Sequence, residues 1–163
     1  MTLVVREAGP GDAATIVALV KELAAFEGMV GRARMSEADV LRDGFGERRH
    51  FECLLVEEAG EILGLAVFYG NYSTFAGRPG LFLEDIFVRE AARGRGVGRL
   101  LMQRLAALAL ARGCVQLELA VLHWNPARAF YQRLGFAHSA DWLPYRLEGE
   151  AIARLAAVPA ERP

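Results

Sequence analysis

The clearest chemistry in this sequence lies in a glycine-rich basic segment, Arg93-Gly-Arg-Gly-Val-Gly98. Glycines let backbone N–H groups come close to an anion, and the N-terminus of a helix adds partial positive charge. The segment follows a strand-like run, 81–88, and begins the longest predicted helix, 97–112. We therefore expect it to bind a phosphate or pyrophosphate group. The alternative is a glycine-rich turn that only joins the strand to the helix.

Two common phosphate-binding motifs do not fit this segment. A Walker loop needs Gly-Lys followed by Ser or Thr, and Lys21 is the only lysine in the chain. A dinucleotide fingerprint that started at Gly94 would need glycine at position 99, where the chain has Arg99. An enzyme that uses a nicotinamide cofactor is therefore not expected. The near absence of lysine also argues against Schiff-base chemistry.

A second segment, Trp124-Asn125-Pro-Ala-Arg-Ala-Phe130-Tyr131 followed by Gly135-Phe136, lies downstream. Together with Arg93-x-x-Gly96-x-Gly98 and the strand before it, this segment resembles the GNAT superfamily of acetyl-CoA-dependent N-acyltransferases. A narrower resemblance is to the diamine (spermidine/spermine) N-acetyltransferase branch. It is carried by Lys21-Glu-Leu-Ala-Ala-Phe-Glu27, Asp43-Gly-Phe-Gly46, Leu83-Glu-Asp85 and the Trp-Asn pair, and it spans residues 1–157.

The resemblance implies how acetyl-CoA, the expected co-substrate, would be held. The backbone of Ile86, Phe87 and Val88 would pair with the pantetheine arm and polarise the thioester carbonyl. Asn125 would also contact the pantetheine, although the stretch from Asn125 to Tyr131 is one residue shorter than is usual for the family. The pyrophosphate would be held mostly by backbone amides of Arg93, Gly94, Arg95, Gly96, Val97, Gly98 and Arg99.

The resemblance also implies direct attack by a free amine, with Glu84 as the base and Tyr131 as the acid. A primary amine with a pKa of about 10 is mostly protonated at pH 7, so a carboxylate that removes its proton is useful. A tyrosine with its ordinary pKa near 10 can donate a proton to the departing thiolate. The alternative for Tyr131 is a helix tyrosine whose ring packs into the core. Because neighbouring strand residues face opposite sides, we expect only one of Glu84 and Asp85 to face the cleft, and we assign Glu84.

The acceptor implied by the resemblance is a small primary amine, such as a polyamine, a diamine or a thialysine-like amine. Carboxylates should meet its positive charge, and an aromatic wall of Phe26, Tyr69, Tyr72 and Phe75 could add cation–π contact. The candidates are Phe26, Glu27, Glu84, Asp85 and Asp141. Glu27 could instead be a solvated charge at a helix end, and aromatic residues at such spacings usually pack. Two alternatives stay open: an acetyltransferase for an amino acid, an aminoglycoside-like drug or a protein N-terminus, and a CoA-binding sensor without catalysis.

The elements that must position these residues form an α+β/α pattern. The strand, helix, strand order from 81 to 121 predicts a parallel crossover, after an antiparallel meander. Strand-like runs are 3–5, 51–57, 62–69, 81–88 and 115–121, with weak closing strands at 136 and 145–147. Helix-like runs are 16–26 after a cap at Asp12, 36–42, 97–112 and 126–134. The resemblance implies a GNAT-like fold, a twisted and mostly antiparallel mixed sheet with splayed central parallel strands, flanked by helices.

Composition limits the remaining possibilities. The chain has 163 residues, which predicts one domain at 1–157 and a loose tail at 158–163. The net charge of −1 argues against nucleic acid and membrane surfaces as partners. Two cysteines, expected to be reduced core residues, and three histidines without ligand spacing predict no metal site. No apolar run of about 18 residues or basic leader is present, so we expect a cytoplasmic protein. The resemblance adds a homodimer whose acceptor pocket lies partly at the subunit interface.

Overall fold

The computed structural model describes residues 2–157, which form two compact units that meet between Ala120 and Val121. We describe each unit by itself. The predicted single domain over 1–157 stays a prediction, and the predicted tail at 158–163 lies outside the described residues. None of the helices in the described chain has the length and apolar character needed to cross a membrane.

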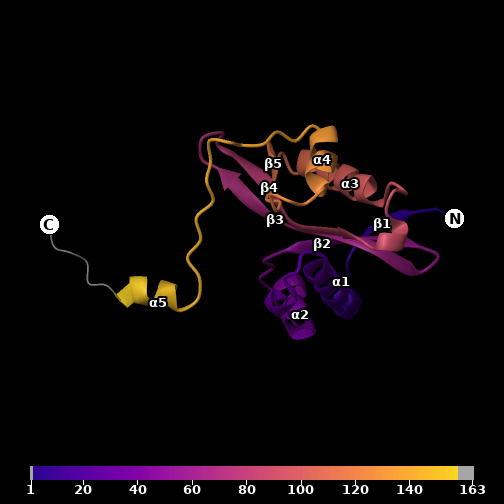
Figure 1. The fold of residues 1–163 in the computed structure, drawn as a ribbon, viewed down its shortest axis with the longest axis horizontal. Coiled ribbons are helices and arrows are strands. Elements are labelled where there is room, and N and C mark those ends of the chain that lie inside the picture. Colours follow the sequence, from indigo (N-terminus) through magenta and orange to yellow (C-terminus); the bar gives the residue numbers. More distant parts are fainter. Residues whose placement is uncertain (1, 158–163) are drawn as a thin grey trace. The chain divides into compact units, whose positions relative to one another are not determined.

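The first unit contains one five-stranded sheet with the order β1-β2-β3-β4-β5 (Figure 1). β1 to β4 pair antiparallel in sequence order, and β5 pairs parallel to β4. The strands are β1 (Val4–Glu7), β2 (Glu52–Glu58), β3 (Glu61–Ser73), β4 (Arg78–Val88) and β5 (Leu117–Leu119). The helices are η1 (Pro10–Asp12), α1 (Ala13–Phe26), η2 (Val30–Arg32), α2 (Glu37–Phe45), η3 (Glu90–Ala92) and α3 (Val97–Ala111). This mixed sheet confirms the predicted fold class and the parallel crossover through α3.

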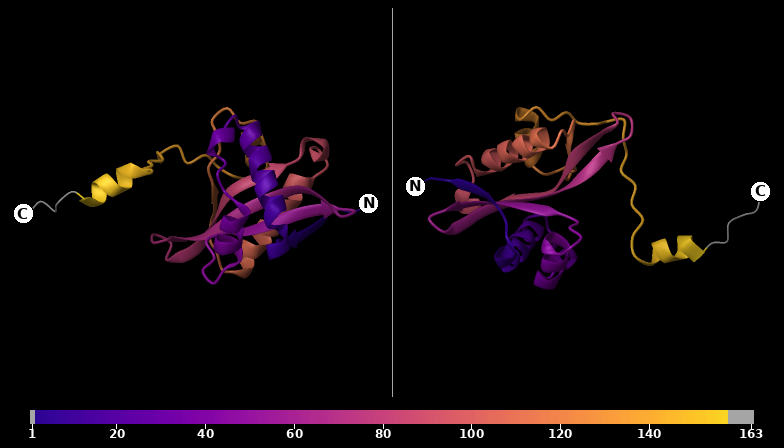
Figure 2. Two further views of the ribbon diagram at one scale, coloured as in Figure 1. Left: turned by 90° about the horizontal axis from the view of Figure 1, so that it is seen from below. Right: turned by 180° about the vertical axis from the view of Figure 1, so that it is seen from behind.

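Helices cover both faces of the sheet, α1 and α2 on one face and α3 on the other (Figure 2). On the first face the core joins Ile16, Leu19 and Leu23 of α1 to Val40 of α2 and to alternate strand residues. Those strand residues are Cys53, Leu55, Leu65, Val67 and Phe87. Cys53 is thus a buried core thiol, as predicted, and burial raises its pKa to about 12.

The residues between them point to the α3 face. Phe68 is buried there, and the Arg112 guanidinium after α3 lies 5.9 Å from its ring centroid. Leu101 and Leu105 of α3 are fully buried. Because both faces of β2 and β3 are covered, these strands are nearly continuous apolar runs rather than alternating ones.

The second unit contains α4 (Ala127–Arg133) and α5 (Glu150–Ala157). α4 matches the helix predicted after Pro126, whereas α5 was not predicted. The closing strands predicted at 136 and 145–147 are wrong, because none of these residues lies in a strand. Tyr145 is 92% exposed, and within the described chain no strand pairs with this segment to satisfy its backbone groups.

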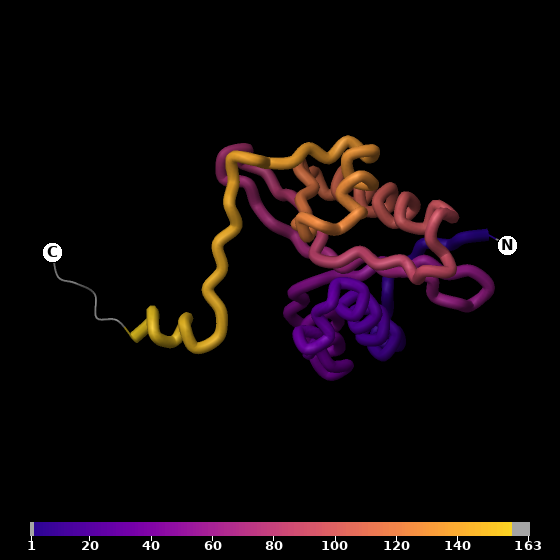
Figure 3. The backbone as a smooth tube through the Cα atoms, viewed as in Figure 1, coloured from indigo at the N-terminus to yellow at the C-terminus, as the bar shows by residue number. Residues whose placement is uncertain are grey.

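Pairing between β4 and β5 is short, which leaves much of one edge of β4 open. It runs only from Leu81↔Leu117 to Leu83↔Leu119, so β5 is shorter than the predicted 115–121. β4 continues to Val88 beside β3, and the backbone trace in Figure 3 shows β3 and β4 running together along their length. The edge of β4 after Leu83 therefore has no strand paired to it on the β5 side among the described residues.

The packing of α3 predicts the effect of a matched pair of substitutions on this helix. Leu105→Ala should lower the free energy of unfolding by about 2–5 kcal/mol, because it leaves a cavity between α3 and the sheet. Leu110→Ala makes the same chemical change at a site that is 79% exposed, and should shift it by about 0.5 kcal/mol or less. Urea unfolding of both variants checks this, and equal losses would contradict the packing described.

Candidate functional site

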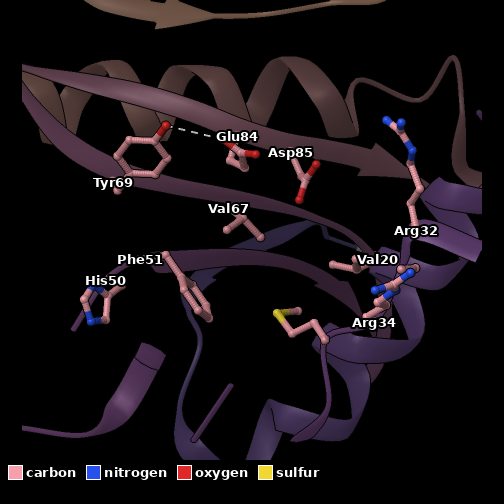
Figure 4. Close-up of a pocket in the computed structure, with 11 residues that line it drawn as sticks. Val20, Arg32, Arg34, His50, Phe51, Val67, Tyr69, Glu84 and Asp85 are labelled. Atoms are coloured by element: carbon pink, nitrogen blue, oxygen red, sulfur yellow. Dashed lines mark hydrogen bonds between the residues drawn. The ribbon is translucent and has the colours of Figure 1, made fainter. Parts of the chain in front are cut away.

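A cavity of about 340 Å³ opens in the first unit between the acidic part of β4 and the segment that follows α1 (Figure 4). Its wall combines carboxylates and an aromatic hydroxyl from the sheet with cationic side chains from the segment between α1 and α2. The lining residues are Val20, Arg32, Ala33, Arg34, Met35, His50, Phe51, Val67, Tyr69, Glu84 and Asp85.

Both acidic residues of β4 face this cavity, which corrects the expectation that only one of them could. Val67 pairs with Asp85, and the next β3 residue, Phe68, pairs with Leu83, so Glu84 is an extra residue. Such a β-bulge sets two residues of one strand against one of its neighbour and shifts the alternation of faces. Glu84 and Asp85 therefore point into the same cavity (Figure 4).

The bulge also explains which other side chains share this face. Tyr69 pairs with Phe82, and their rings stack with centroids 5.3 Å apart. Regular alternation would place Phe82 and Asp85, three residues apart, on opposite faces of the sheet. With Glu84 inserted, they lie on one face together with Tyr69 and Val67.

Asp85 carries the strongest electrostatic signal in the cavity. Burial and the nearby charges of Glu84 and Glu27 raise the pKa of its carboxyl from 3.8 to about 6. Burial also raises the pKa of Glu27. Within the described chain no arginine, lysine or histidine lies within ion-pair distance of any of these three carboxylates. The β4 side of the cavity therefore carries carboxylates that form no close ion pair, and it favours a cationic group of a ligand.

Tyr69, which the sequence offered either for an aromatic wall or for ordinary packing, lines the cavity. Its hydroxyl donates to Oε2 of Glu84 at an O···O distance of 3.4 Å. Burial, then the charge of Glu84, raises the pKa of Tyr69, so the phenol keeps its proton. The signal that could have identified it is its register opposite Phe82, which the bulge brings to the same face of the sheet as Asp85. The sequence alone does not reveal that bulge.

Other residues predicted for the acceptor site lie elsewhere. Phe26 does not line the cavity, and its ring lies under the Arg93 guanidinium, 4.8 Å from the centroid. Tyr72 and Phe75 are 62% and 95% exposed. Asp141 is an exposed residue of the second unit. The structure thus brings together Glu84 and Asp85, with Glu27 near enough to raise the pKa of Asp85.

The glycine-rich segment forms a turn that ends at the N-terminus of α3. Gly94 and Gly96 have φ of 76° and 87°, in the left-handed region that favours glycine, and Gly96 is the N-cap residue. The first amides of the helix, at Val97, Gly98 and Arg99, have no acceptor within the helix and remain available to an anion. Arg93 and Arg95 are held by other groups, since Arg93 Nε donates to Val88 O at 3.0 Å and Arg95 pairs with Glu58 at 2.6 Å.

The open edge of β4 offers backbone groups at alternate residues. The Arg89 N–H donates to Leu63 O at 2.9 Å, so the odd-numbered residues at this end of β4 direct their backbone groups toward β3. Ile86 and Val88 direct theirs to the opposite edge, beyond the last β5 pair. Of the three predicted pantetheine contacts, Phe87 therefore has its backbone groups on the β3 side.

The remaining predicted residues lie in the second unit. Tyr131 is a buried residue of α4 whose ring contacts those of Phe130 and Phe136, at centroid distances of 5.4 and 5.9 Å. Asn125 is buried, and its Oδ1 accepts a hydrogen bond from the Ala127 N–H at 2.9 Å. Asn125 thus caps the start of α4. Over residues 2–157 no three His, Cys, Asp or Glu side chains form a group suited to a metal ion.

Comparison with known proteins adds independent findings. The family model for the acetyltransferase (GNAT) family matches residues 18–136. Thialysine N-epsilon-acetyltransferase from Bos taurus is 39% identical, covering 94% of this chain and 97% of its own length. Spermidine/spermine N(1)-acetyltransferase-like protein 1 from Homo sapiens is 33% identical over 93% of this chain and 23% of that protein.

Solved structures show the same fold. An integron cassette protein from the mobile metagenome of V. cholerae has a TM-score of 0.82 and 25% identity, covering 97% of this chain and 99% of that chain. An aminoglycoside acetyltransferase from an uncultured soil sample has a TM-score of 0.75 and 24% identity, covering 91% of this chain and all of that chain. The second likeness bears on the fold alone.

The raised pKa of Asp85 makes a prediction about stability. A carboxyl whose pKa rises from 3.8 to about 6 on folding destabilises the folded state as pH rises through that window, because the folded state holds the proton more tightly. Asp85→Asn removes the buried charge and should raise the free energy of unfolding at pH 7 by on the order of 2 kcal/mol.

The pH dependence separates this effect from better packing. Most of the gain from Asp85→Asn should be lost by pH 4, where Asp85 is neutral in the folded state and only about half ionised in the unfolded state. Asp141→Asn, the same change at an exposed site, should have no such effect. Urea unfolding from pH 4 to pH 8 measures both variants, and a gain that is equal at every pH would refute the charge argument.

Proposed function

Because the chain belongs to the acetyltransferase (GNAT) family and is an N-acetyltransferase, we propose that it acetylates the primary amine of a small acceptor. The acceptor class is a thialysine-like amine, a diamine or a polyamine, and the acetyl donor is acetyl-CoA. The observation that carries the acceptor proposal is the cavity with Glu84 and Asp85 on one wall, neither of which pairs with a cation of residues 2–157. An ammonium group supplies the missing positive charge.

The residues around the glycine turn fit the donor. Acetyl-CoA supplies an acyl group activated as a thioester. We assign its pyrophosphate to the amides at the start of α3, where glycines at 94 and 96 leave the backbone open. We assign the pantetheine arm to the backbone groups of Ile86 and the N–H of Val88, which a chain lying along an open strand edge can reach. The Val88 carbonyl already accepts from Arg93 Nε. Asn125 remains a candidate pantetheine contact, although its Oδ1 already accepts a hydrogen bond from the first residue of α4, Ala127.

Glu84 is proposed as the base. Moving a proton from a free ammonium to an ordinary carboxylate is uphill by about 6 pKa units, or about 8 kcal/mol. The acceptor nitrogen must therefore reach the acyl carbon as the free amine, the small fraction that is unprotonated at pH 7, because an ammonium group has no lone pair with which to attack. We assign to Glu84 the proton that this nitrogen loses as its bond to the acyl carbon forms, when the acidity of the nitrogen rises. The Tyr69 hydroxyl holds one oxygen of Glu84 on the cavity side. Asp85, deeper in the cavity, holds the positive charge of the acceptor.

Tyr131 is proposed as the acid that protonates the departing thiolate. The support for this role is that Tyr131 lies in the segment that carries the family resemblance, at the position of the family's proton-donating tyrosine. By the same resemblance we propose a homodimer, with part of the acceptor pocket at the subunit interface, and a cytoplasmic location.

Thiol release from acetyl-CoA tests the proposed function directly. The purified protein should release thiol with thialysine, a diamine or spermidine. Tyr131→Phe should lower kcat by about 10²-fold or more while leaving the fold intact, since one general acid typically contributes this much. Tyr145→Phe, the same change at a residue that is 92% exposed, should leave kcat unchanged. Thiol release with none of these amines would reject the proposed acceptor class.

The glycine turn makes a separate prediction about the donor. Gly96→Ala adds a methyl group to the N-cap of α3 and should raise the KM for acetyl-CoA by about tenfold, or about 1.4 kcal/mol. Gly113→Ala is the matched control, because Gly113 follows the other end of α3 and also has a positive φ, 67°. Both variants carry similar backbone strain, of about 1 kcal/mol. Only Gly96→Ala should change the KM for acetyl-CoA, and equal changes would contradict the assignment.

A further inference from the structure

Two arginines line the same cavity as the acidic pair. Arg32 ends η2, and Arg34 lies in the segment between η2 and α2. Figure 4 shows both arginines on the side of the cavity away from Tyr69. Glu84 and Asp85 enter the same cavity from β4. The cavity is therefore lined by opposite charges that belong to different elements.

The two sets of charges do not neutralise each other. Elsewhere in the chain arginines pair closely with carboxylates, as in Arg89–Glu22 at 2.9 Å and Arg112–Glu52 at 2.6 Å. Arg32 and Arg34 are exposed, and neither has a carboxylate within ion-pair distance among residues 2–157. The cavity thus offers a free cationic group and a free anionic group to one ligand.

We propose that Arg32 and Arg34 form a carboxylate-binding subsite, and that the acceptor is an α-amino acid whose side chain ends in a primary amine. The proposal rests on the proposed function and narrows its acceptor class. The side-chain ammonium lies at Glu84 and Asp85, and the α-carboxylate lies at the arginines. Guanidinium groups match a carboxylate through paired hydrogen bonds. The cavity, at about 340 Å³, lies at the small end of the range for ligand pockets.

A polyamine fits the two arginines less well. A diamine leaves both guanidinium groups without a partner. A longer polyamine brings a further ammonium group toward them, and like charges at close range repel. The arginines therefore select for a carboxylate and against an extended polycation.

The test compares acceptors that differ only in the carboxylate: lysine with cadaverine, and ornithine with putrescine. Wild-type kcat/KM, from thiol release, should favour each amino acid over its diamine. The double variant Arg32→Ala, Arg34→Ala should lower this preference by about 10- to 100-fold, as expected for lost hydrogen bonds to a charged group. The double variant Arg32→Lys, Arg34→Lys should restore part of this preference. Arg78→Ala, which removes an exposed arginine outside the cavity, should leave the preference unchanged.

The outcomes separate this proposal from the proposed function. The subsite is overturned if the wild type turns over the diamines as fast as the amino acids or faster. It is also overturned if the double variant keeps the wild-type preference. In both cases acetyl transfer itself stands. If no amine gives thiol release, the proposed function fails, and calorimetric binding of lysine and cadaverine to both proteins still decides the subsite. Tighter binding of lysine that is lost in the double variant supports it, and equal binding of the two ligands overturns it.

Discussion

The bulge at Glu84 is the constraint on which the candidate site depends. One extra residue in β4, where Val67 meets Asp85 and Phe68 meets Leu83, changes which face the following side chains occupy. Without it, Asp85 would point toward α3 and Glu84 alone would face the cavity. With it, two carboxylates share a small volume with Tyr69. The same strand then presents Ile86 and Val88 to an open edge, so the acceptor cavity and the proposed donor edge are both set by β4.

Burying these neighbouring carboxylates is unfavourable, and the packing of the rest of the unit holds them in the cavity. Asp85 ionises less readily than an ordinary aspartate because it is buried beside Glu84 and Glu27. An isolated pair of strands would expose Asp85 to water, which would remove the burial that contributes most to its raised pKa. Here β4 is paired with β3 as far as Val88, and the sheet is packed against α1 on one face and α3 on the other. The packed core therefore preserves an acidic cavity that the cavity residues alone would not stabilise.

Sequence reasoning succeeded where a local signal carries the structure. Hydrophobic periodicity placed α3, and the change from antiparallel strands to strand, helix, strand gave the parallel β5. Motif resemblance indicated the family through Arg93 to Gly98 and the segment around Tyr131. Reasoning failed where a contact between distant residues decides. The bulge at Glu84 exists only through pairing with β3, so alternation wrongly separated Glu84 from Asp85. The segment 145–147 has strand-like residues, but no strand of residues 2–157 pairs with it. The next element after it is the helix α5.

Arg32 and Arg34 were not found by motif resemblance. Their position indicates that recognition of the far end of the acceptor is separate in the fold from the reacting groups. The glycine turn proposed for the donor, the open strand edge and the acidic pair lie on β4 and on the segment between it and α3. The pairing of the sheet and the N-terminus of α3 fix their geometry. Arg32 and Arg34 lie outside the sheet, in the short segment between α1 and α2, and no sheet pairing constrains their side chains. A change at 32 or 34 can therefore alter which acceptor end group is favoured without moving the acids or the glycine turn. A sequence comparison guided by the shared motifs passes over these positions, because what they recognise is the ligand end that does not react.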